Sequence, residues 1–341
     1  MTHRFKNPRA RHNFQGRTCS ISGVGSYVPE KILTNADLEK MVETSDEWIT
    51  SRTGIKERRI AAPNEHTSDL ATKAAERAMK MAGVTADQID LIIVATLTPD
   101  MLFPSTACLV QRKLGATRAA AFDMEAACSG FIYALEIGQN FVMARTYETV
   151  LVIGAEKLSS IVNWKDRNTC VLFGDGAGAA ILQNRENSHG LLTAVMGADG
   201  NKADLLSMPG GGSACPATPE SVAKGLHYLR MDGKETFKNA VQAMVSAAHE
   251  AMKRCEVDIT KIKCVIPHQA NQRIVDAVGE RLGCTPEQLF VNLHKYGNTS
   301  AASVAIALDE AVFSGKIKRG DLILLVVFGA GLTWGAAVIE W

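Results

Sequence analysis

One cysteine stands where the chain changes from an expected strand to an expected helix. Residues 119–124 form a short apolar run, and apolar residues recur at helical spacing after Cys128, from Phe131 to Ile137. The small residues on either side of the cysteine allow a sharp turn. Backbone N–H groups and the helix dipole at such a position favour a thiolate over a thiol. A thiolate attacks acyl thioesters, so the pattern indicates a nucleophile for covalent acyl transfer.

The other cysteines of the chain illustrate the alternative interpretation of Cys128, which is a structural role. The chain has eight cysteines, and a free cysteine is most often a small buried hydrophobe. The strand–turn–helix context separates Cys128 from the rest, but the assignment also needs partner residues.

Two polar residues in the second half of the chain are the candidate partners. His268 follows an apolar run and precedes a helix expected near Asn271, and Asn298 lies in a loop rich in small residues. Histidine exchanges a proton near neutral pH, while asparagine donates a hydrogen bond and stays neutral. With Cys128 they supply a nucleophile and two groups that hold an enolate or thioester oxygen. Taken singly, the histidine is an ordinary packed residue and the asparagine a helix cap.

An internal repeat predicts the elements that position these residues. Three segments of the first half recur in the same order in the second half, namely 90–115 with 263–283, 120–138 with 289–311, and 149–182 with 321–339. Strands alternate with helices in each half, which indicates right-handed βα units and largely parallel sheets. Runs such as LIIVAT and LILLVV are typical of strands covered on both faces. We therefore expect an α/β fold with five layers, α/β/α/β/α, built from two pseudo-repeated halves.

The polar stretch 183–190 interrupts the pattern and marks the boundary between the halves. We expect a mobile basic tail at 1–17, a first half at 18–186 that carries the nucleophile, and a second half at 187–341 that carries the histidine and the asparagine. Catalytic groups of α/β sheets gather at the carboxyl ends of strands. Packing of the two halves would bring the three loops to one site.

Bulk properties exclude several classes of function. The chain has 341 residues, is 46% hydrophobic and carries a net charge of +1, so nothing points to nucleic acid or to a membrane surface. No apolar run approaches the ~20 residues that cross a bilayer. Cysteines without CxxC pairs indicate a reducing, cytoplasmic location and no structural zinc. The glycine-rich stretch 174–180 leads into an expected strand, unlike a dinucleotide-binding motif.

From about Ser20 to the C-terminus the chain resembles the β-ketoacyl-[acyl-carrier-protein] synthase III family of the thiolase superfamily. The motifs that carry this resemblance are TSDEWITSRTGIKERRI, ACSGF, FGDGAGAA, MDGKETFK, IPHQANQRI, YGNTSAAS and GAGLTWG. The resemblance implies that Cys128 accepts an acyl group from acyl-CoA, with acetyl-CoA as the expected primer. His268 and Asn298 would stabilise the enolate formed when malonyl-acyl-carrier protein loses carbon dioxide. The carbanion would attack the Cys128 thioester to give 3-ketoacyl-carrier protein, the first step of type II fatty-acid synthesis, with no cofactor or metal.

The same resemblance assigns the binding residues. The oxyanion hole would consist of the backbone N–H groups of Cys128 and Ala330, the latter in a turn that commonly has three glycines. The residues implied for CoA are Trp48 and Arg167 around the adenine, Arg52 at a phosphate, and Thr53, Gly233 and Asn271 along the pantetheine tunnel.

Further residues are implied for the acyl group and for the carrier protein. The acyl pocket would contain Phe237, Phe328, Leu332 and, across the interface of a homodimer, Phe103. Lys238, Arg273 and Arg281 would form a basic rim for an acidic carrier protein, or else an ordinary solvated face.

Three alternative functions are compatible with some of these features. A starter enzyme of a secondary pathway, or an acyltransferase that makes esters or amides, would share the fold. A degradative thiolase normally uses a second cysteine, which the loop around Asn298 does not offer. A non-catalytic lipid-binding homologue is disfavoured because all three members of the proposed triad are present.

Overall fold

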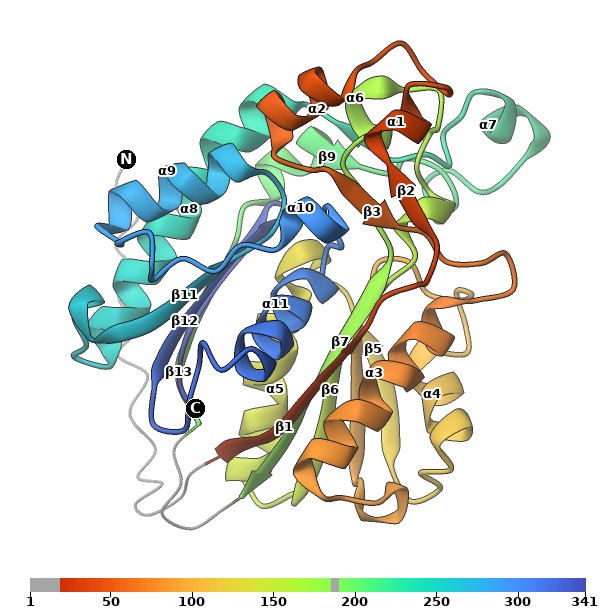
Figure 1. Cartoon of the computed structure of the whole chain (residues 1–341). Coiled ribbons are helices and arrows are strands. Elements are labelled where there is room, and N and C mark those ends of the chain that lie inside the picture. Colours follow the sequence, from red (N-terminus) through yellow and green to blue (C-terminus); the bar gives the residue numbers. More distant parts are fainter. Residues whose placement is uncertain (1–18, 185–189) are drawn as a thin grey trace.

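Two β-sheets and three layers of helices stack as α/β/α/β/α, the arrangement that the sequence predicts (Figure 1). The computed structural model describes residues 19–184 and 190–341. The expected tail at 1–17 lies outside the described residues.

The first sheet has five strands in the order β1-β7-β6-β4-β5. The strands β6, β4 and β5 are parallel, whereas β7 is antiparallel to both β6 and β1. Their bounds are Cys19–Tyr27 for β1, Leu91–Ala95 for β4, Ala120–Met124 for β5, Thr149–Glu156 for β6 and Gly176–Asn184 for β7.

The second sheet has four strands in the order β11-β12-β13-β8. They span Leu191–Ala198 (β8), Ile262–Pro267 (β11), Leu322–Gly329 (β12) and Thr333–Glu340 (β13). Only β11 and β12 are parallel. The expectation of largely parallel sheets is therefore wrong. The connection between β12 and β13 is too short for the crossover that a parallel pair requires, so a hairpin forms.

The internal repeat is visible in the strand order. Strands β8, β13, β12 and β11 stand in the second sheet where β1, β7, β6 and β4 stand in the first. The counterpart of β5 is reduced to one parallel bridge between Leu289 and Val265. The sheet changes between Asn184 and Leu191, close to the division proposed at 186/187.

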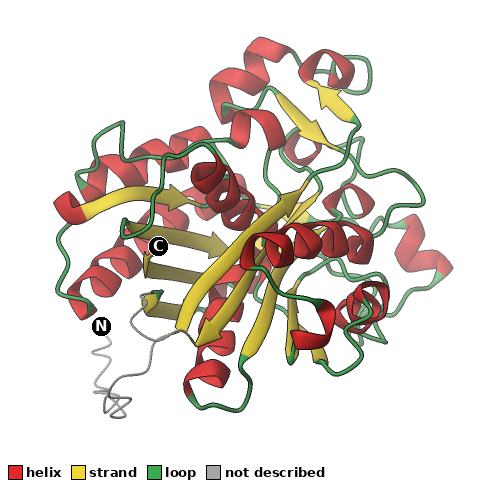
Figure 2. Cartoon of the chain, turned by 60° about the horizontal axis from the view of Figure 1, so that its bottom comes forward, coloured by secondary structure: helices red, strands yellow, loops and turns green. Residues whose placement is uncertain are grey.

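The central layer consists of α5 (Gly130–Met143) and α11 (Ala302–Phe313), which lie between the sheets (Figures 1 and 2). One hydrophobic cluster joins both helices to both sheets. Residues 302–308 of α11 are all buried, as expected for a helix that is apolar on every side. The nucleophile loop and the Asn298 loop precede these two helices, so the core of the molecule fixes both.

The outer layers cover the other face of each sheet. Helices α3 (Thr67–Ala82) and α4 (Thr106–Leu114) cover the first sheet, and α8 (Gly233–Arg254) and α9 (Gln272–Leu282) cover the second. Helices α4 and α9 share a Leu-Gly end, and each stops at a left-handed glycine. None of the helices within the described ranges is long and apolar enough to cross a membrane.

Short elements form a cap over one end of the layers, at the top of Figure 1. These are β2 (Ile32–Thr34), α1 (Asn35–Leu38), α2 (Asp46–Thr53), β3 (Glu57–Arg59), α6 (Arg167–Cys170), β9 (Leu206–Ser207), α7 (Pro219–Ala223), β10 (Arg230–Met231) and α10 (Leu293–Tyr296). The 3₁₀ turns of the chain are η1 (Ala86–Gln88), η2 (Ala127–Ser129), η3 (Leu158–Ser160), η4 (Gly200–Leu205) and η5 (Ile259–Lys261). A separate apolar cluster holds much of this cap together.

Candidate active site

Cys128 lies in η2, one turn before α5 begins. The preceding residue, Ala127, has a positive φ of 45°, and its N–H donates to the Glu125 carboxylate at 2.7 Å. This hydrogen bond holds the sharp turn that the small residues of the sequence predict. The turn begins after the carboxyl end of β5, so the cysteine stands where the strand–turn–helix pattern places it.

The ionisation of Cys128 differs from the sequence-based expectation. Burial raises the pKa of its thiol to about 12, and the nearby Glu156 carboxylate acts in the same direction, while the Ser300 hydroxyl lowers it in part. The expectation that the helix terminus favours a thiolate is therefore wrong for the free enzyme. Removal of the sulfur from water outweighs the small stabilisation that the short turn supplies.

His268 follows β11 and is buried. Its backbone N–H donates to the Val326 carbonyl of β12 at 2.7 Å, and its ring Nδ1 lies 3.0 Å from the Ser303 hydroxyl of α11. Burial lowers the pKa of the imidazole to about 4, so the ring is neutral at pH 7.

The surroundings of Ser303 favour one tautomer of this neutral ring. The Ser303 oxygen accepts the Gln269 backbone N–H at 2.8 Å, and Nδ1 of His268 lies within reach of the Ser303 proton. With Ser303 as the donor, the ring proton resides on Nε2. A histidine in this state offers a hydrogen-bond donor to a substrate oxygen.

Asn298 is held by backbone and side chain together. Its N–H donates to the Leu172 carbonyl at 2.8 Å, and its carbonyl accepts the Gly174 N–H at 3.0 Å. Its Oδ1 accepts the Ser300 N–H at 2.9 Å. The side-chain oxygen is thus occupied, which leaves the Nδ2 donors for a ligand.

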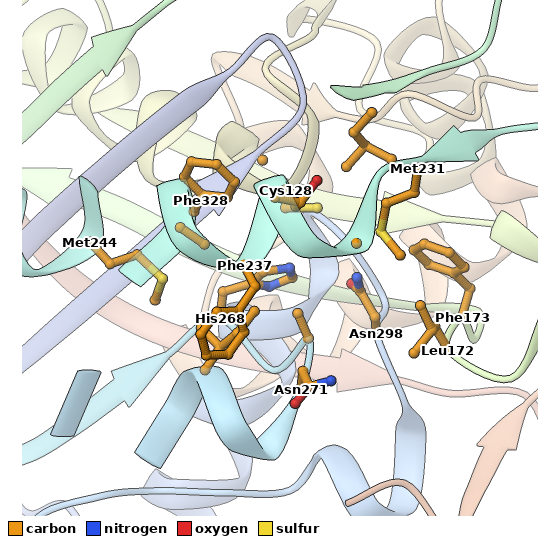
Figure 3. Close-up of a pocket in the computed structure, with 17 residues that line it drawn as sticks. Cys128, Leu172, Phe173, Met231, Phe237, Met244, His268, Asn271, Asn298 and Phe328 are labelled. Atoms are coloured by element: carbon orange, nitrogen blue, oxygen red, sulfur yellow. The ribbon is translucent and has the colours of Figure 1, made fainter. Parts of the chain in front are cut away.

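The side chains of Cys128, His268 and Asn298 line one cavity of about 140 Å³ (Figure 3). They come from three loops in two halves of the chain. The cavity therefore combines a thiol with two neutral hydrogen-bond donors, a set suited to a thioester or enolate oxygen.

The turn after β12 packs directly on the nucleophile loop. A Cβ at Gly329 would lie 2.6 Å from the Cys128 nitrogen, a distance that only glycine permits. Ala330 has no positive φ, whereas Gly331 has a φ of 127°. The alanine therefore introduces no backbone strain at this turn.

The residues expected to bind CoA form two groups. Gly233 and Asn271 line the cavity. Trp48, Arg52 and Arg167 lie outside it, with both guanidinium groups over the indole ring, at 4.8 Å for Arg52 and 5.1 Å for Arg167.

The second group needs a rearrangement before it can hold an adenine. An adenine ring held between Trp48 and Arg167 would stack on each side chain at about 3.5 Å, so the two side chains would have to be roughly 7 Å apart. They are 5.1 Å apart, so the Arg167 side chain has to move. Asn271 donates to the Arg52 carbonyl at 3.1 Å, which connects the two groups. Thr53 is buried, and its hydroxyl donates to Ile49.

The residues expected around the acyl group are also divided. Phe237 and Phe328 line the cavity. Leu332 is not among the lining residues and packs in the core between the second sheet and α8. Phe103 is 83% exposed and does not line the cavity of its own chain. The three basic residues Lys238, Arg273 and Arg281 are exposed on α8 and α9.

Sequence patterns did not single out several other residues of the cavity. Helix α8 contributes Thr236, Ala240 and Met244, which share one face of the helix at three- to four-residue spacing with Phe237. This spacing was visible but is typical of any buried helix face. The remainder are Leu172, Phe173, Leu206, Met231, Ala270, Ile274 and Gly329. No group of three or more His, Cys, Asp or Glu side chains suited to a metal occurs in the described part of the chain.

Comparisons with known proteins agree with this geometry. Residues 122–200 match the family model described as 3-oxoacyl-[acyl-carrier-protein] synthase III, and residues 252–341 match the model of its C-terminal part. The β-ketoacyl-[acyl-carrier-protein] synthase III of Caldanaerobacter subterraneus is 61% identical over 94% of this chain and 97% of that protein.

Two solved structures are similar along nearly their whole length. The 3-oxoacyl-[acyl-carrier-protein] synthase III of Aquifex aeolicus has a TM-score of 0.88 and 50% identity, covering 95% of this chain and 100% of that one. The priming β-ketosynthase of the R1128 polyketide pathway has a TM-score of 0.88 and 36% identity, covering 95% and 96%.

We predict that Gly329→Ala lowers acetyl transfer to Cys128 by about 10²-fold or more, because the added Cβ displaces the backbone of the proposed oxyanion hole. Gly200→Ala is the matched control, since its Cβ would meet nothing within 4 Å. Labelling of both variants with radioactive acetyl-CoA measures the effect. A Gly329→Ala enzyme as fast as the control would contradict the close packing at this turn.

Proposed function

This chain belongs to the 3-oxoacyl-[acyl-carrier-protein] synthase III family, and we propose that three of its residues divide the chemistry of that family between them. The enzyme is an acyltransferase that condenses an acyl-CoA with malonyl-acyl-carrier protein and so initiates fatty-acid biosynthesis. The observation that supports the division of labour is the position of Cys128, His268 and Asn298 around one cavity.

In the first half-reaction Cys128 takes the acyl group. Its sulfur attacks the acyl-CoA thioester, and CoA leaves as the thiol once a proton reaches it. The negative charge that develops on the carbonyl oxygen is stabilised by the backbone N–H groups of Cys128 and Ala330. The contact between Gly329 and the Cys128 nitrogen supports this assignment, because it brings the turn that contains Ala330 beside the sulfur.

In the second half-reaction His268 and Asn298 act on malonyl-acyl-carrier protein. Loss of carbon dioxide leaves an enolate whose oxygen accepts hydrogen bonds from Nε2 of His268 and Nδ2 of Asn298. The enolate carbon then attacks the Cys128 thioester and yields 3-ketoacyl-carrier protein. Decarboxylation itself creates the carbanion, so we propose that neither a cofactor nor a metal takes part. A neutral imidazole suits this role because it donates without removing a proton.

The two substrates reach the cavity from the side where α8 and α9 begin. We assign CoA to Trp48, Arg52, Thr53, Arg167, Gly233 and Asn271, and the acyl chain to Phe103, Phe237, Phe328 and Leu332. Lys238 and Arg273 flank cavity residues on these helices and suit an acidic carrier protein, while Arg281 lies about 12 Å farther along α9. We further propose acetyl-CoA as the primer and the cytoplasm as the location.

A starter enzyme of a secondary pathway is the second candidate, because a polyketide priming β-ketosynthase shares the fold. The higher identity to fatty-acid synthases of this family favours the primary pathway. A panel of acyl-CoA primers assayed with malonyl-acyl-carrier protein separates the two, since a secondary-pathway enzyme would prefer a primer other than acetyl-CoA.

We also propose a homodimer formed through the edge of the first sheet. Within the described part of the chain, strand β5 pairs only with β4, and such an unpaired edge is the usual template for pairing with another chain. The adjacent loop exposes Leu102 and Phe103, each at 83%. Asp123 of β5 accepts the Thr106 and Ala107 N–H groups and ties this loop to the open edge.

We predict that Cys128→Ser abolishes covalent labelling by radioactive acetyl-CoA, because serine lacks the nucleophilic sulfur. Labelled protein separated from free CoA under denaturing conditions provides the measurement. The exposed Cys108 serves as the matched control, and Cys108→Ser should label as the wild type does. Persistent labelling of Cys128→Ser would show that the covalent step is assigned to the wrong residue.

We predict that His268→Ala and Asn298→Ala impair decarboxylation of malonyl-acyl-carrier protein by at least about 10²-fold, and acylation of Cys128 much less. The physical reason is that the two side chains donate to the enolate, whereas backbone N–H groups serve the first step. Carbon dioxide release and acetyl labelling measure the two steps separately. Equal loss of both in folded protein would refute this division.

We predict that Phe103→Glu yields a monomer with impaired condensation, because a carboxylate cannot be buried in the partner's pocket. Phe313→Glu is the matched control, as Phe313 is 89% exposed at the far end of α11. Sedimentation equilibrium together with activity provides the measurement. A dimeric, fully active Phe103→Glu enzyme would argue against both the interface and the role of Phe103.

A further inference from the structure

A buried carboxyl group lies beneath the nucleophile, and the two half-reactions above do not use it. Glu156 is the last residue of β6 and is 0% exposed. Its charge acts on Cys128 and raises the pKa of that thiol. A buried carboxyl beside a catalytic sulfur calls for a physical explanation, since its charge is costly to bury.

The hydrogen bonds of Glu156 are unevenly shared between its two oxygens. Oε2 accepts the hydroxyls of Thr96 (3.1 Å) and Thr98 (2.5 Å) together with the Leu97 and Thr98 N–H groups. Among the described residues, Oε1 accepts the Leu97 N–H at a longer distance of 3.3 Å. Oε1 therefore keeps the capacity to accept a proton.

The packing of β6 indicates where this carboxyl points. Gly154 lies two residues before Glu156 in β6, and a Cβ at Gly154 would collide with the Ala301 carbonyl of the loop that follows Asn298. Residues two apart in a strand share one face, so the side chain of Glu156 is directed at the same loop of the second half.

Ser300 occupies this second loop in the position that Ala127 has in the first. Both residues have a positive φ, 45° for Ala127 and 48° for Ser300. Each donates its N–H to the side chain two residues earlier, Glu125 or Asn298. The two loops thus share one geometry, but the second presents a hydroxyl.

The Ser300 hydroxyl acts on both the carboxyl and the thiol. It is buried, makes no ordinary hydrogen bond among the described residues, and lowers the pKa of both groups against the larger, opposing effect of burial. A hydroxyl in this position can accept a proton from one neighbour while it donates its own to the other.

The first half-reaction needs such a proton acceptor. The Cys128 thiol holds its proton at pH 7, because its pKa is about 12. His268 is neutral, and the favoured tautomer already has a proton on Nε2. The imidazole therefore donates to the substrate and does not accept from the thiol.

We propose that Glu156 accepts the thiol proton of Cys128 through the hydroxyl of Ser300 during acylation, an inference that rests on the proposed covalent role of Cys128. The thiol proton passes to Oγ of Ser300 as the Ser300 proton passes to Oε1 of Glu156, and the sulfur forms its bond to the acyl carbon. The tetrahedral intermediate then expels the CoA thiolate. The proton returns by the same route to the CoA sulfur, so Glu156 ends the step as a carboxylate. Glu156 does not touch the substrate in this scheme, because it acts through Ser300.

The electrostatic surroundings of Glu156 suit reversible proton storage. Burial raises its pKa to about 7, and the groups that lower it are Thr98, Ser300, Leu97 and Thr96. Glu125 acts on Cys128 from the first loop, and the Lys157 ammonium is directed away to the carbonyls of Ala62 and Glu65.

The pH dependence of acylation tests the relay. In the wild type the rate of single-turnover labelling by acetyl-CoA should rise with pH and level off above about pH 7, where Glu156 is ionised. In Glu156→Gln and Ser300→Ala the rate at pH 7 should fall about 10²-fold. It should then rise about tenfold for each pH unit up to pH 9, because free thiolate must form without help. Glu156→Asp should retain the plateau.

Three controls separate this relay from a structural effect and from a failure of the proposed function. Carbon dioxide release from malonyl-acyl-carrier protein should stay within about threefold of the wild type in Glu156→Gln and Ser300→Ala. Asp309→Asn, a partly buried carboxyl that accepts from Ser26 at the far end of α11, should leave the profile unchanged. Cys128→Ser should lose labelling altogether.

The outcomes are distinct. Wild-type rates and a wild-type plateau in Glu156→Gln and Ser300→Ala would overturn the relay while leaving Cys128 as the nucleophile. Equal loss of both half-reactions in these variants would assign a structural role to Glu156 and also overturn it. Labelling of Cys128→Ser would instead overturn the proposed function itself.

Discussion

The close contact between the end of β12 and the nucleophile loop is the constraint on which the site depends. Gly329 belongs to the second half of the chain, and any side chain there would collide with the Cys128 backbone. The contact sets how near the halves approach each other and therefore where His268 and Asn298 lie relative to the sulfur. It also brings the Ala330 turn beside Cys128. The repeat explains why the contact exists, because Gly154 in β6 packs just as closely on Ala301, on the opposite side of the seam.

Burial gives the site an electrostatic character that suits its chemistry. The thiol is protonated and the imidazole neutral, and the carboxamide has no charge at any pH. Neutral donors in a dry cavity stabilise a developing oxyanion strongly, yet they do not hold a resting charge that would be costly to bury. A consequence of this burial is that the Cys128 thiol does not ionise without a proton acceptor. Glu156 and Ser300 provide a place for its proton within the same seam, which connects the packing of the halves to the first chemical step.

Sequence patterns predict much of this structure, but they do not predict the features that tertiary contacts determine. The ordered repeat predicts the layers and the two central helices, and the small residues around Cys128 predict the turn. The mixed sheets were missed because the hairpin of β12 and β13 depends on a three-residue connection that the apolar run conceals. The raised pKa of the thiol was missed since the depth of burial depends on Phe328, Gly329 and the cap. Nothing in the sequence marks Glu156, because its burial at the end of β6 depends on packing against the second half.

A crystal structure of the enzyme acetylated with acetyl-CoA would test the central claim most directly, namely that groups from both halves converge on one thioester. The account predicts an acetyl group on Sγ of Cys128, its carbonyl oxygen within hydrogen-bond distance of the backbone N–H groups of Cys128 and Ala330. Nε2 of His268 and Nδ2 of Asn298 should face the space beside the acetyl carbon. An acetyl group on another residue, or a carbonyl oxygen that contacts neither backbone N–H, would contradict the account.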